Sequence, residues 1–208
     1  MKGLLLKDWY MMKKYCRAYL VIAVVFIAVS LVNTDNMFFL FYPCMFCGMI
    51  PDNLLAYDER SRWMQYSGTL PYTRAQIVSA KYLIGLLTQV VILVLTGIAQ
   101  GVKMAVSGTF VLSDFMVLIL LLLTVSTFTS SISLPFFFKF GVEKGRTAYY
   151  AMIGFVCGAS VLASSLLNAQ TEMEIQPNLL LEVLPLIGIC VYALSWYLSI
   201  VFYKKREL

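Results

Sequence analysis

Two cysteines three residues apart, Cys44 and Cys47, are the side chains of this sequence that most directly suggest chemistry. A C-x-x-C pair can cycle between dithiol and disulfide where a nearby cation lowers the pKa of a thiol. This pair instead follows Pro43 in an apolar stretch with no neighbouring cation, which favours simple packing in a membrane helix. A membrane thiol oxidoreductase that uses Cys44 and Cys47 is the alternative.

Other reactive groups are scarce. Histidine is absent from the 208 residues, which excludes His-based metal sites and Ser-His or Cys-His nucleophile pairs. Residues 141–147 (GVEKGRT) are similar to a phosphate-binding loop, but the segment is one residue short and has Arg146 where that loop needs Lys. We interpret it as a turn. We therefore expect no catalytic residue, no metal site and no cofactor in this chain.

Several polar residues lie inside apolar segments. Gln89 is one, and the others are hydroxyl residues that include Ser126, Thr127 and Ser130. In a membrane such groups either join helices by hydrogen bonds or line a path for a substrate, and both interpretations stay open. Asp52, beside Pro51, is the carboxylate within an apolar segment and so a functional candidate, although it is also close enough to the segment's end to reach the interface.

Six apolar segments must position these groups, at about residues 18–33, 37–57, 82–105, 115–134, 148–167 and 185–203. The composition is 61% hydrophobic, against about 45–50% in soluble domains. We predict an all-α polytopic membrane protein with six transmembrane helices in a single domain, residues 1–208. Residues 1–17 form an amphipathic pattern that predicts an interfacial helix. Residues 168–184 form either a re-entrant helix or an interfacial linker.

The distribution of charge predicts the orientation. If the N-terminus lies inside, fifteen of the 16 Lys and Arg residues are internal and only Lys103 is external. Because positively charged loops stay in the cytoplasm, both termini are expected there, with the chain in the cell membrane. The net charge of +5 belongs to these loops, so we expect contact with the lipid bilayer and none with nucleic acid.

The longest segment without a membrane-grade apolar run is residues 58–81, DERSRWMQYSGTLPYTRAQIVSAK. Asp58 is suited to cap a short helix over residues 58–68 and to pair with Arg62 at i,i+4. Trp63 and Tyr66 fall on one face of that helix, and Gly68 is suited to end it. This pattern predicts a short, rigid helix outside the membrane.

A second helix is predicted to follow at once. Pro71 turns the chain, and residues 73–76 (TRAQ) read as a capping box with Tyr72 and Ile77 as its hydrophobic staple. The helix is expected over Arg74–Lys103, about 45 Å long, which exceeds the ~30 Å hydrocarbon thickness. It should therefore protrude from the membrane and carry the short helix at its end.

Residues 58–82 resemble the loop between the second and third spans of type-2 ABC exporter permeases, in particular the short six-span kind encoded apart from its ATPase. The resemblance rests on an acidic-basic start, Trp63, a Leu-Pro turn at Pro71 with Arg74, then Ile-Val and Lys81-Tyr82. It covers about 25 residues closely and the six-span layout loosely. It implies a type-2 ABC exporter transmembrane domain with an N-terminal elbow helix and a cytoplasmic coupling helix at residues 58–68.

The resemblance also implies a function, export of a substrate with ATP and Mg²⁺ bound by a separate partner. Contact with that ATPase is expected from Asp58, Glu59, Arg60, Arg62, Trp63 and Tyr66. The turn and the start of the long helix are expected to depend on Pro71, Thr73, Arg74 and Lys81, the last two at the lipid headgroups. The partners would be two ABC ATPase subunits and a second copy or a related permease, and the narrower resemblance suggests a peptide substrate.

Two alternatives remain beside this interpretation. A six-span substrate-binding subunit of a vitamin importer would dock through a separate scaffold subunit and would not need a capped cytoplasmic helix. The thiol oxidoreductase would need no ATPase partner.

Overall fold

The computed structural model describes residues 2–32, 38–108, 110–167 and 177–205, and within these ranges the chain forms helices and no strand. The helices are α1 (Lys2–Tyr15), α2 (Arg17–Val32), α3 (Phe38–Gly48), α4 (Ile50–Arg60), α5 (Trp63–Ser67), α6 (Arg74–Val106), α7 (Leu112–Phe140), α8 (Val142–Leu167) and α9 (Pro177–Lys205). The prediction of an all-α protein is confirmed for this part of the chain.

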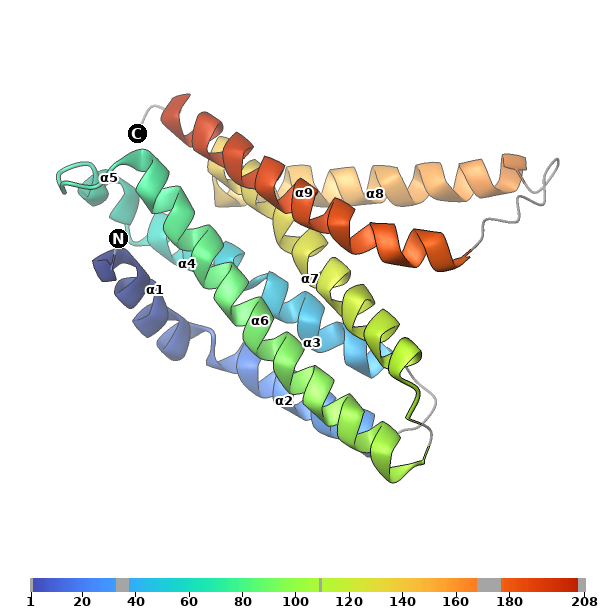
Figure 1. Ribbon diagram of the computed structural model, residues 1–208. Coiled ribbons are helices and arrows are strands. Elements are labelled where there is room, and N and C mark those ends of the chain that lie inside the picture. Colours follow the sequence, from blue (N-terminus) through green and yellow to red (C-terminus); the bar gives the residue numbers. More distant parts are fainter. Residues whose placement is uncertain (1, 33–37, 109, 168–176, 206–208) are drawn as a thin grey trace.

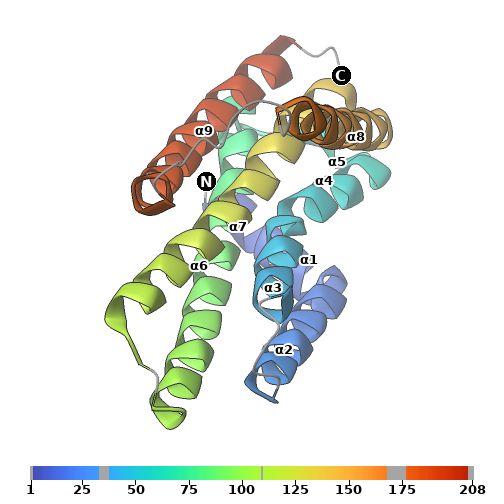
Figure 2. The same ribbon diagram turned by 90° about the vertical axis from the view of Figure 1, so that its right-hand side faces the viewer.

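The helices form a bundle around α7 (Figure 1). α7 packs most extensively against α9, and it lies between α9 on one side and α3 on the other (Figure 2). The start of α1, the end of α9, α5 and the junction between α7 and α8 all lie at one end of the bundle, whereas the end of α6 and the start of α7 lie at the other (Figure 1). Which side of the membrane each end faces stays a prediction from charge.

Four helical segments of the described chain are long and apolar enough to cross a membrane: Phe39–Arg60, Arg74–Val106, Leu112–Phe140 and Leu184–Lys205. The pair Lys2–Tyr15 and Arg17–Leu31, bent by 66°, makes a fifth if it is taken as one broken span. Three of the six expected segments fall within these spans, and a fourth, residues 37–57, begins two residues before its span. The other two lie in α2 and α8, and the count of six stays a prediction.

The second apolar segment is broken in two, between α3 and α4. Pro43 lies inside α3, while Pro51 occupies the first turn of α4, where its missing N–H costs little. The break falls at Met49, next to Gly48, where an added Cβ would lie 3.1 Å from the Ser126 backbone oxygen of α7. Glycine here therefore lets the backbones of α3 and α7 approach closely.

The prediction for the long helix is confirmed within three residues. α6 spans Arg74–Val106, 33 residues or about 50 Å. The capping box is present: the Gln76 backbone N–H donates to Thr73 Oγ1 (3.3 Å), and the Thr73 N–H donates to Gln76 Oε1 (3.1 Å). Tyr72 and Ile77 pack into the same apolar core, as expected of a hydrophobic staple.

The segment 168–184 lies partly outside the described residues, which exclude 168–176. Residues 177–184 form the first two turns of α9 and continue through Pro185 into the rest of that helix. Whether this segment enters the membrane as a re-entrant helix or lies at the interface stays a prediction.

Candidate functional site

The region around α5 differs from the predicted single helix over residues 58–68, and that prediction is wrong. α4 continues through Asp58 to Arg60, Arg62 adopts a left-handed conformation (φ 55°), and α5 begins only at Trp63. Such a conformation is uncommon for a residue with a side chain, and it redirects the chain sharply. Asp58 therefore lies in the last turn of α4 and caps no helix.

Asp58 is instead part of a buried group of charges that we call the four-charge cluster: Lys7, Asp8, Asp58 and Lys81. Lys81 Nζ lies 2.7 Å from Asp8 Oδ1 and 2.6 Å from Asp58 Oδ2. Lys7 Nζ lies 2.8 Å from Asp58 Oδ1 and 3.3 Å from Asp8 Oδ1. Asp8, Asp58 and Lys81 are at most 2% exposed. Two cations and two carboxylates balance, as buried charges require.

Trp63 connects α5 to this cluster. Lys7 Nζ lies 4.2 Å from the centroid of the Trp63 ring, a cation–π contact, and the ring also packs against the apolar core. The Trp63 and Tyr66 rings share one face as predicted, with centroids 5.6 Å apart. Trp63 is half-buried, whereas Tyr66 is 59% exposed. Tyr66, together with exposed Arg60 and Arg62, therefore presents the outward surface of this region.

The four-charge cluster joins helices that are far apart in sequence. Lys7 and Asp8 come from α1, Asp58 from α4 and Lys81 from α6, and Trp63 adds α5. Sequence reasoning missed Lys7 and Asp8. A signal for Asp8 exists, because it is the only acid in residues 1–17 and lies at four-residue spacing from Leu4 and Met12, which are both buried.

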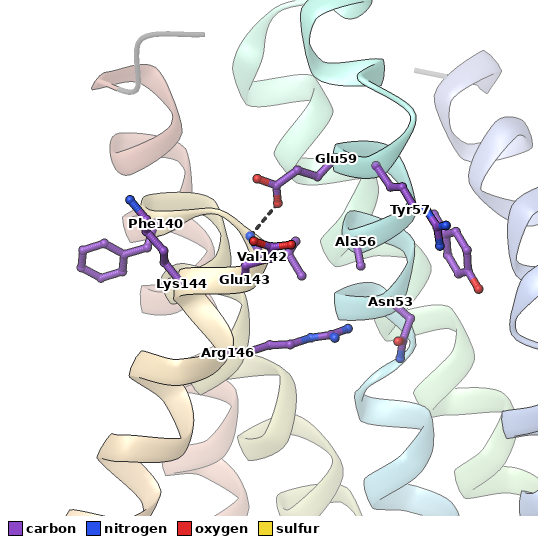
Figure 3. Close-up of a pocket in the computed structure, with 10 residues that line it drawn as sticks. Asn53, Ala56, Tyr57, Glu59, Phe140, Val142, Glu143, Lys144 and Arg146 are labelled. Atoms are coloured by element: carbon purple, nitrogen blue, oxygen red, sulfur yellow. Dashed lines mark hydrogen bonds between the residues drawn. The ribbon is translucent and has the colours of Figure 1, made fainter.

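Glu59 connects the same region to α8. The Val142 backbone N–H, at the start of α8, donates to Glu59 Oε2 (2.6 Å), drawn as a dashed line in Figure 3. A carboxylate here satisfies a free N–H group and interacts favourably with the positive end of the helix dipole. Gly141 alone separates α7 from α8, with φ 83°. The segment that is similar to a phosphate-binding loop is thus a turn followed by helix.

A cavity of about 850 Å³ lies between α4 and the start of α8, beside Glu59. Its charged lining residues are Glu59, Arg60, Glu143, Lys144 and Arg146. Figure 3 shows Arg146 extending from α8 toward α4 across this space. The cavity is open and polar, at the end of the bundle where α5 lies.

Of the two residues expected at the lipid headgroups, Arg74 is exposed and Lys81 is buried. Arg74 Nη1 donates to the backbone oxygens of Lys204 (2.9 Å) and Tyr203 (3.3 Å). It thereby satisfies carbonyl groups that the end of α9 leaves without partners. Lys81, expected at the headgroups, is instead buried in the four-charge cluster, because two carboxylates from other helices meet it there.

The candidates for a substrate path come together between α3, α6 and α7. Gln89 Nε2 donates to Ser130 Oγ (2.6 Å) and to the Ser126 backbone oxygen (3.1 Å), and Ser130 Oγ donates to the Gly48 backbone oxygen (2.7 Å). These bonds show that the group joins helices. Gln89, Ser126 and Thr127 also line an apolar cavity of about 290 Å³, and among the described residues Gln89 Oε1 and Ser126 Oγ have no partner.

The two cysteines of the C-x-x-C pair are buried within α3. Cys44 is 1% and Cys47 0% exposed, both as free thiols. Cys44 Sγ lies 4.0 Å from Thr96 Oγ1 of α6. Both belong to an apolar core with Cys16, Leu54 and Ile92.

Comparison with known proteins identifies the chain's family. Searches of curated proteins and of solved structures gave no match. A family model described as ABC-2 family transporter protein matches residues 3–204, almost the entire chain. Its permeases associate with ABC ATPases, and the apolar helices described above agree with a multi-pass membrane protein of this kind. The chain therefore belongs to the ABC-2 family of transporter proteins.

Proposed function

We propose that this chain is the permease subunit of an ATP-driven exporter that moves a substrate, with peptides as the favoured class, out across the cytoplasmic membrane. Two separate ATPase subunits would bind ATP and Mg²⁺, and a second copy of the chain or a related permease would complete the translocation path. Both termini would lie in the cytoplasm, as the charge distribution indicates.

The observation that carries this proposal is the four-charge cluster beside α5. An ATPase can move a permease only if the contacted segment is held firmly to the helices that must move. Separating buried ion pairs leaves charges without partners in a low-dielectric interior, which costs several kcal/mol. Trp63 connects α5 to this cluster through Lys7. A displacement of α5 would therefore take α1, α4 and α6 with it.

The helices offer a route from this cluster to the opposite end of the bundle. α6 is continuous over about 50 Å and would transmit the displacement as a rigid body, while the break at Met49 would let α3 and α4 change their relative angle. Glu59 would pass the same motion to α8 through its bond to Val142. Rigid-body motions of this kind underlie alternating access in transporters.

Direct contact with the ATPase would come from the exposed part of the region, Arg60, Arg62 and Tyr66. Asp58 and Trp63 would act from within, because Asp58 is buried and Trp63 lies against Lys7. Glu59 binds the start of α8 from within the protein. It would also contact the ATPase only if the ATPase reached the cavity beside it. We further propose that Gln89, Ser126, Thr127 and Ser130 lie along the substrate path, since two of their polar atoms have no partner beside an apolar cavity.

The proposal is tested by purifying the tagged chain from its own host in mild detergent. We expect an ABC ATPase to co-purify and the complex to hydrolyse ATP. Tyr66→Ala combined with Arg62→Glu should release that ATPase, because a central aromatic anchor contributes about 2 kcal/mol or more and charge reversal at a contact disfavours association.

A matched control is Tyr197→Ala on α9, which removes a tyrosine of similar exposure (66%) far from α5 in sequence. It should leave the complex intact. If no ABC ATPase accompanies the wild-type chain, the exporter proposal is wrong. If the ATPase stays bound to the Tyr66 and Arg62 variant, α5 is not its contact.

A further inference from the structure

An apolar groove of about 700 Å³ runs between α1 and α6, and none of the described residues that line it belongs to the four-charge cluster. α1 contributes Leu5, Leu6 and Trp9, and α6 contributes residues between Leu83 and Val91. Of the described residues that line the groove, only Lys2 is charged. Asp8 of α1 thus contacts the cluster, whereas Trp9, the next residue, lines the groove.

The groove opens outward rather than into the core. On α6, Leu87, Val90 and Val91 are each about half exposed (47%, 50% and 49%), and on α1 Leu6 is 56% exposed. α6 is one of the segments that can span a membrane, so we expect this exposed apolar surface to face hydrocarbon. An occupant of the groove must therefore be apolar over most of its length.

The length and charge of the groove narrow the class of occupant. Leu83 to Val91 is nine residues of helix, about 12 Å, which is close to the ~15 Å depth of one leaflet, half of the ~30 Å hydrocarbon core. Lys2 lies at the start of α1, at the end of the bundle where α5 lies (Figure 1). The groove thus pairs one cation at the membrane surface with an apolar channel one leaflet deep.

We propose that this groove binds one acyl chain of an anionic phospholipid from the cytoplasmic leaflet, with the lipid phosphate at Lys2. The leaflet follows from the orientation proposed above, whereas binding itself requires no ATPase. A Lys side chain near a cytoplasmic membrane surface attracts anionic lipids. The bound lipid would hold α1 against α6 next to the ion pairs that connect α5.

A second copy of the chain fits this groove less well. A two-fold axis along the membrane normal brings the same patch of each copy together at the same depth. Two Lys2 side chains would then approach each other, and like charges disfavour the contact. An anionic lipid brings the opposite charge to the same position.

The test uses Trp9, which lines the groove, as a reporter of lipid contact. In a Trp63→Phe/Trp196→Phe background Trp9 is the only tryptophan, since the sequence has three. The chain is placed in phosphatidylcholine vesicles containing a small fraction of lipid with brominated acyl chains, which quench tryptophan on contact. We expect brominated phosphatidylglycerol to quench Trp9 with about a fivefold preference over brominated phosphatidylcholine, the contribution of about one lysine.

Two charge variants locate the headgroup. Lys2→Gln should abolish the preference, and Lys14→Gln, which removes an exposed cation of the same helix outside the groove, should preserve it. Val90→Phe should lower quenching by both lipids because the larger ring fills the groove. Native mass spectrometry of the chain with all its tryptophans, wild type against Lys2→Gln, gives a second count of retained phosphatidylglycerol that does not depend on the fluorescence background.

The results of these experiments distinguish a bound anionic lipid from a second copy of the chain as the occupant of the groove. Equal quenching by the two brominated lipids, or equal loss of preference in Lys2→Gln and Lys14→Gln, overturns the proposal. Absence of quenching by either lipid, together with disulfide cross-linking between copies through Leu6→Cys and Leu87→Cys, would assign the groove to a second copy instead. Because no ATPase is present, none of these results depends on the exporter proposal.

Discussion

At the scale of single residues, the main finding is that Asp58 and Lys81, which the sequence predicts at the surface, are buried and form ion pairs. Lys81 and Asp58 are 1% and 2% exposed; they contact each other, and Lys81 also contacts Asp8. Buried ion pairs often add little net stability relative to an apolar pair, but removing one partner leaves the other charge uncompensated. Removing one member of the cluster should therefore cost more stability than replacing the whole group with apolar residues.

Asp58→Asn should destabilise the chain by about 3–5 kcal/mol, because it keeps the shape of the side chain but leaves the cluster with one excess positive charge. Lys7→Gln added to Asp58→Asn restores charge balance, and Lys7 is the most exposed member of the cluster (23%), so the double variant should recover part of the loss. Thermal unfolding in detergent measures both.

Lys13→Gln is the control for Lys7→Gln, since Lys13 is an exposed cation on the same helix that contacts the Trp9 ring rather than a carboxylate. It should leave the midpoint of unfolding within about a degree of the wild type. A double variant that is less stable than Asp58→Asn alone would show that charge balance is not what holds the cluster.

The cysteine pair makes a second prediction at this scale. Cys44 and Cys47 are buried in apolar core, so Cys44→Ala/Cys47→Ala should leave transport largely intact, with a modest loss of stability from the small cavities formed. Transport is measured in cells with matched amounts of membrane-inserted protein. If transport disappears while insertion and assembly stay normal, the thiol oxidoreductase interpretation returns.

At the scale of elements, α5 owes its position to contacts made by neighbouring helices, since five residues cannot hold a helix alone. Trp63 anchors α5 on Lys7, and the left-handed Arg62 sets the direction in which α5 leaves α4. Tyr66 lies beside Trp63 on α5 but is exposed to the outside. Truncating Trp63 and truncating Tyr66 should therefore have different effects.

Trp63→Ala should lower both the thermal stability of the chain and its association with the ATPase, because α5 loses its anchor and the core loses a large ring. Tyr66→Ala should lower association while leaving stability of the isolated chain within about 0.5 kcal/mol, as is usual for exposed positions. Thermal unfolding of the chain alone and co-purification of the complex separate the two effects. Identical behaviour of both variants would contradict the distinction between anchor and contact.

At the scale of the whole molecule, the start of α1, α5, the α7–α8 junction and the end of α9 all gather at one end of the bundle (Figure 1). Fifteen of the 16 Lys and Arg residues belong to segments expected at that end, and Lys103 belongs to the other. Lys103 Nζ donates to the Ser30 backbone oxygen (2.6 Å) near the end of α2, where a cation is favourable at the carboxyl end of a helix. The positive-inside tendency predicts that the first end lies in the cytoplasm.

Single cysteines at Ser61, Lys144 and Ser107 test this orientation in a background without native cysteines. All three positions are exposed. A membrane-impermeant thiol reagent added to intact cells should label Ser107→Cys, at the far end of α6, and leave Ser61→Cys and Lys144→Cys unlabelled. Permeabilised cells provide the control in which all three react. Labelling of residue 61 but not 107 in intact cells would invert the orientation and contradict the exporter proposal as well.

The sequence by itself determined the features that depend on neighbouring residues. The apolar segments are visible because each helix that crosses a membrane must satisfy its own backbone and cover it with apolar side chains. The start of α6 at Arg74 is visible because a capping box acts over four residues. The motif in residues 58–82 is also a local pattern, so it can be read from the sequence, and membership of the ABC-2 family agrees with it.

Only the tertiary structure decided which charges meet. Lys81 and Asp8 are 73 residues apart, and Glu59 and Val142 are 83 apart, so no periodicity within one helix can reveal either contact. The predicted helix over 58–68 failed for the same reason: its caps are good locally, but the pairing of Asp58 with Lys7 and Lys81 holds it in α4. Local propensities contribute tenths of a kcal/mol per residue, whereas an unpaired buried charge costs several kcal/mol. The cost of leaving a charge unpaired therefore outweighs the local preference and decides the fold around Asp58.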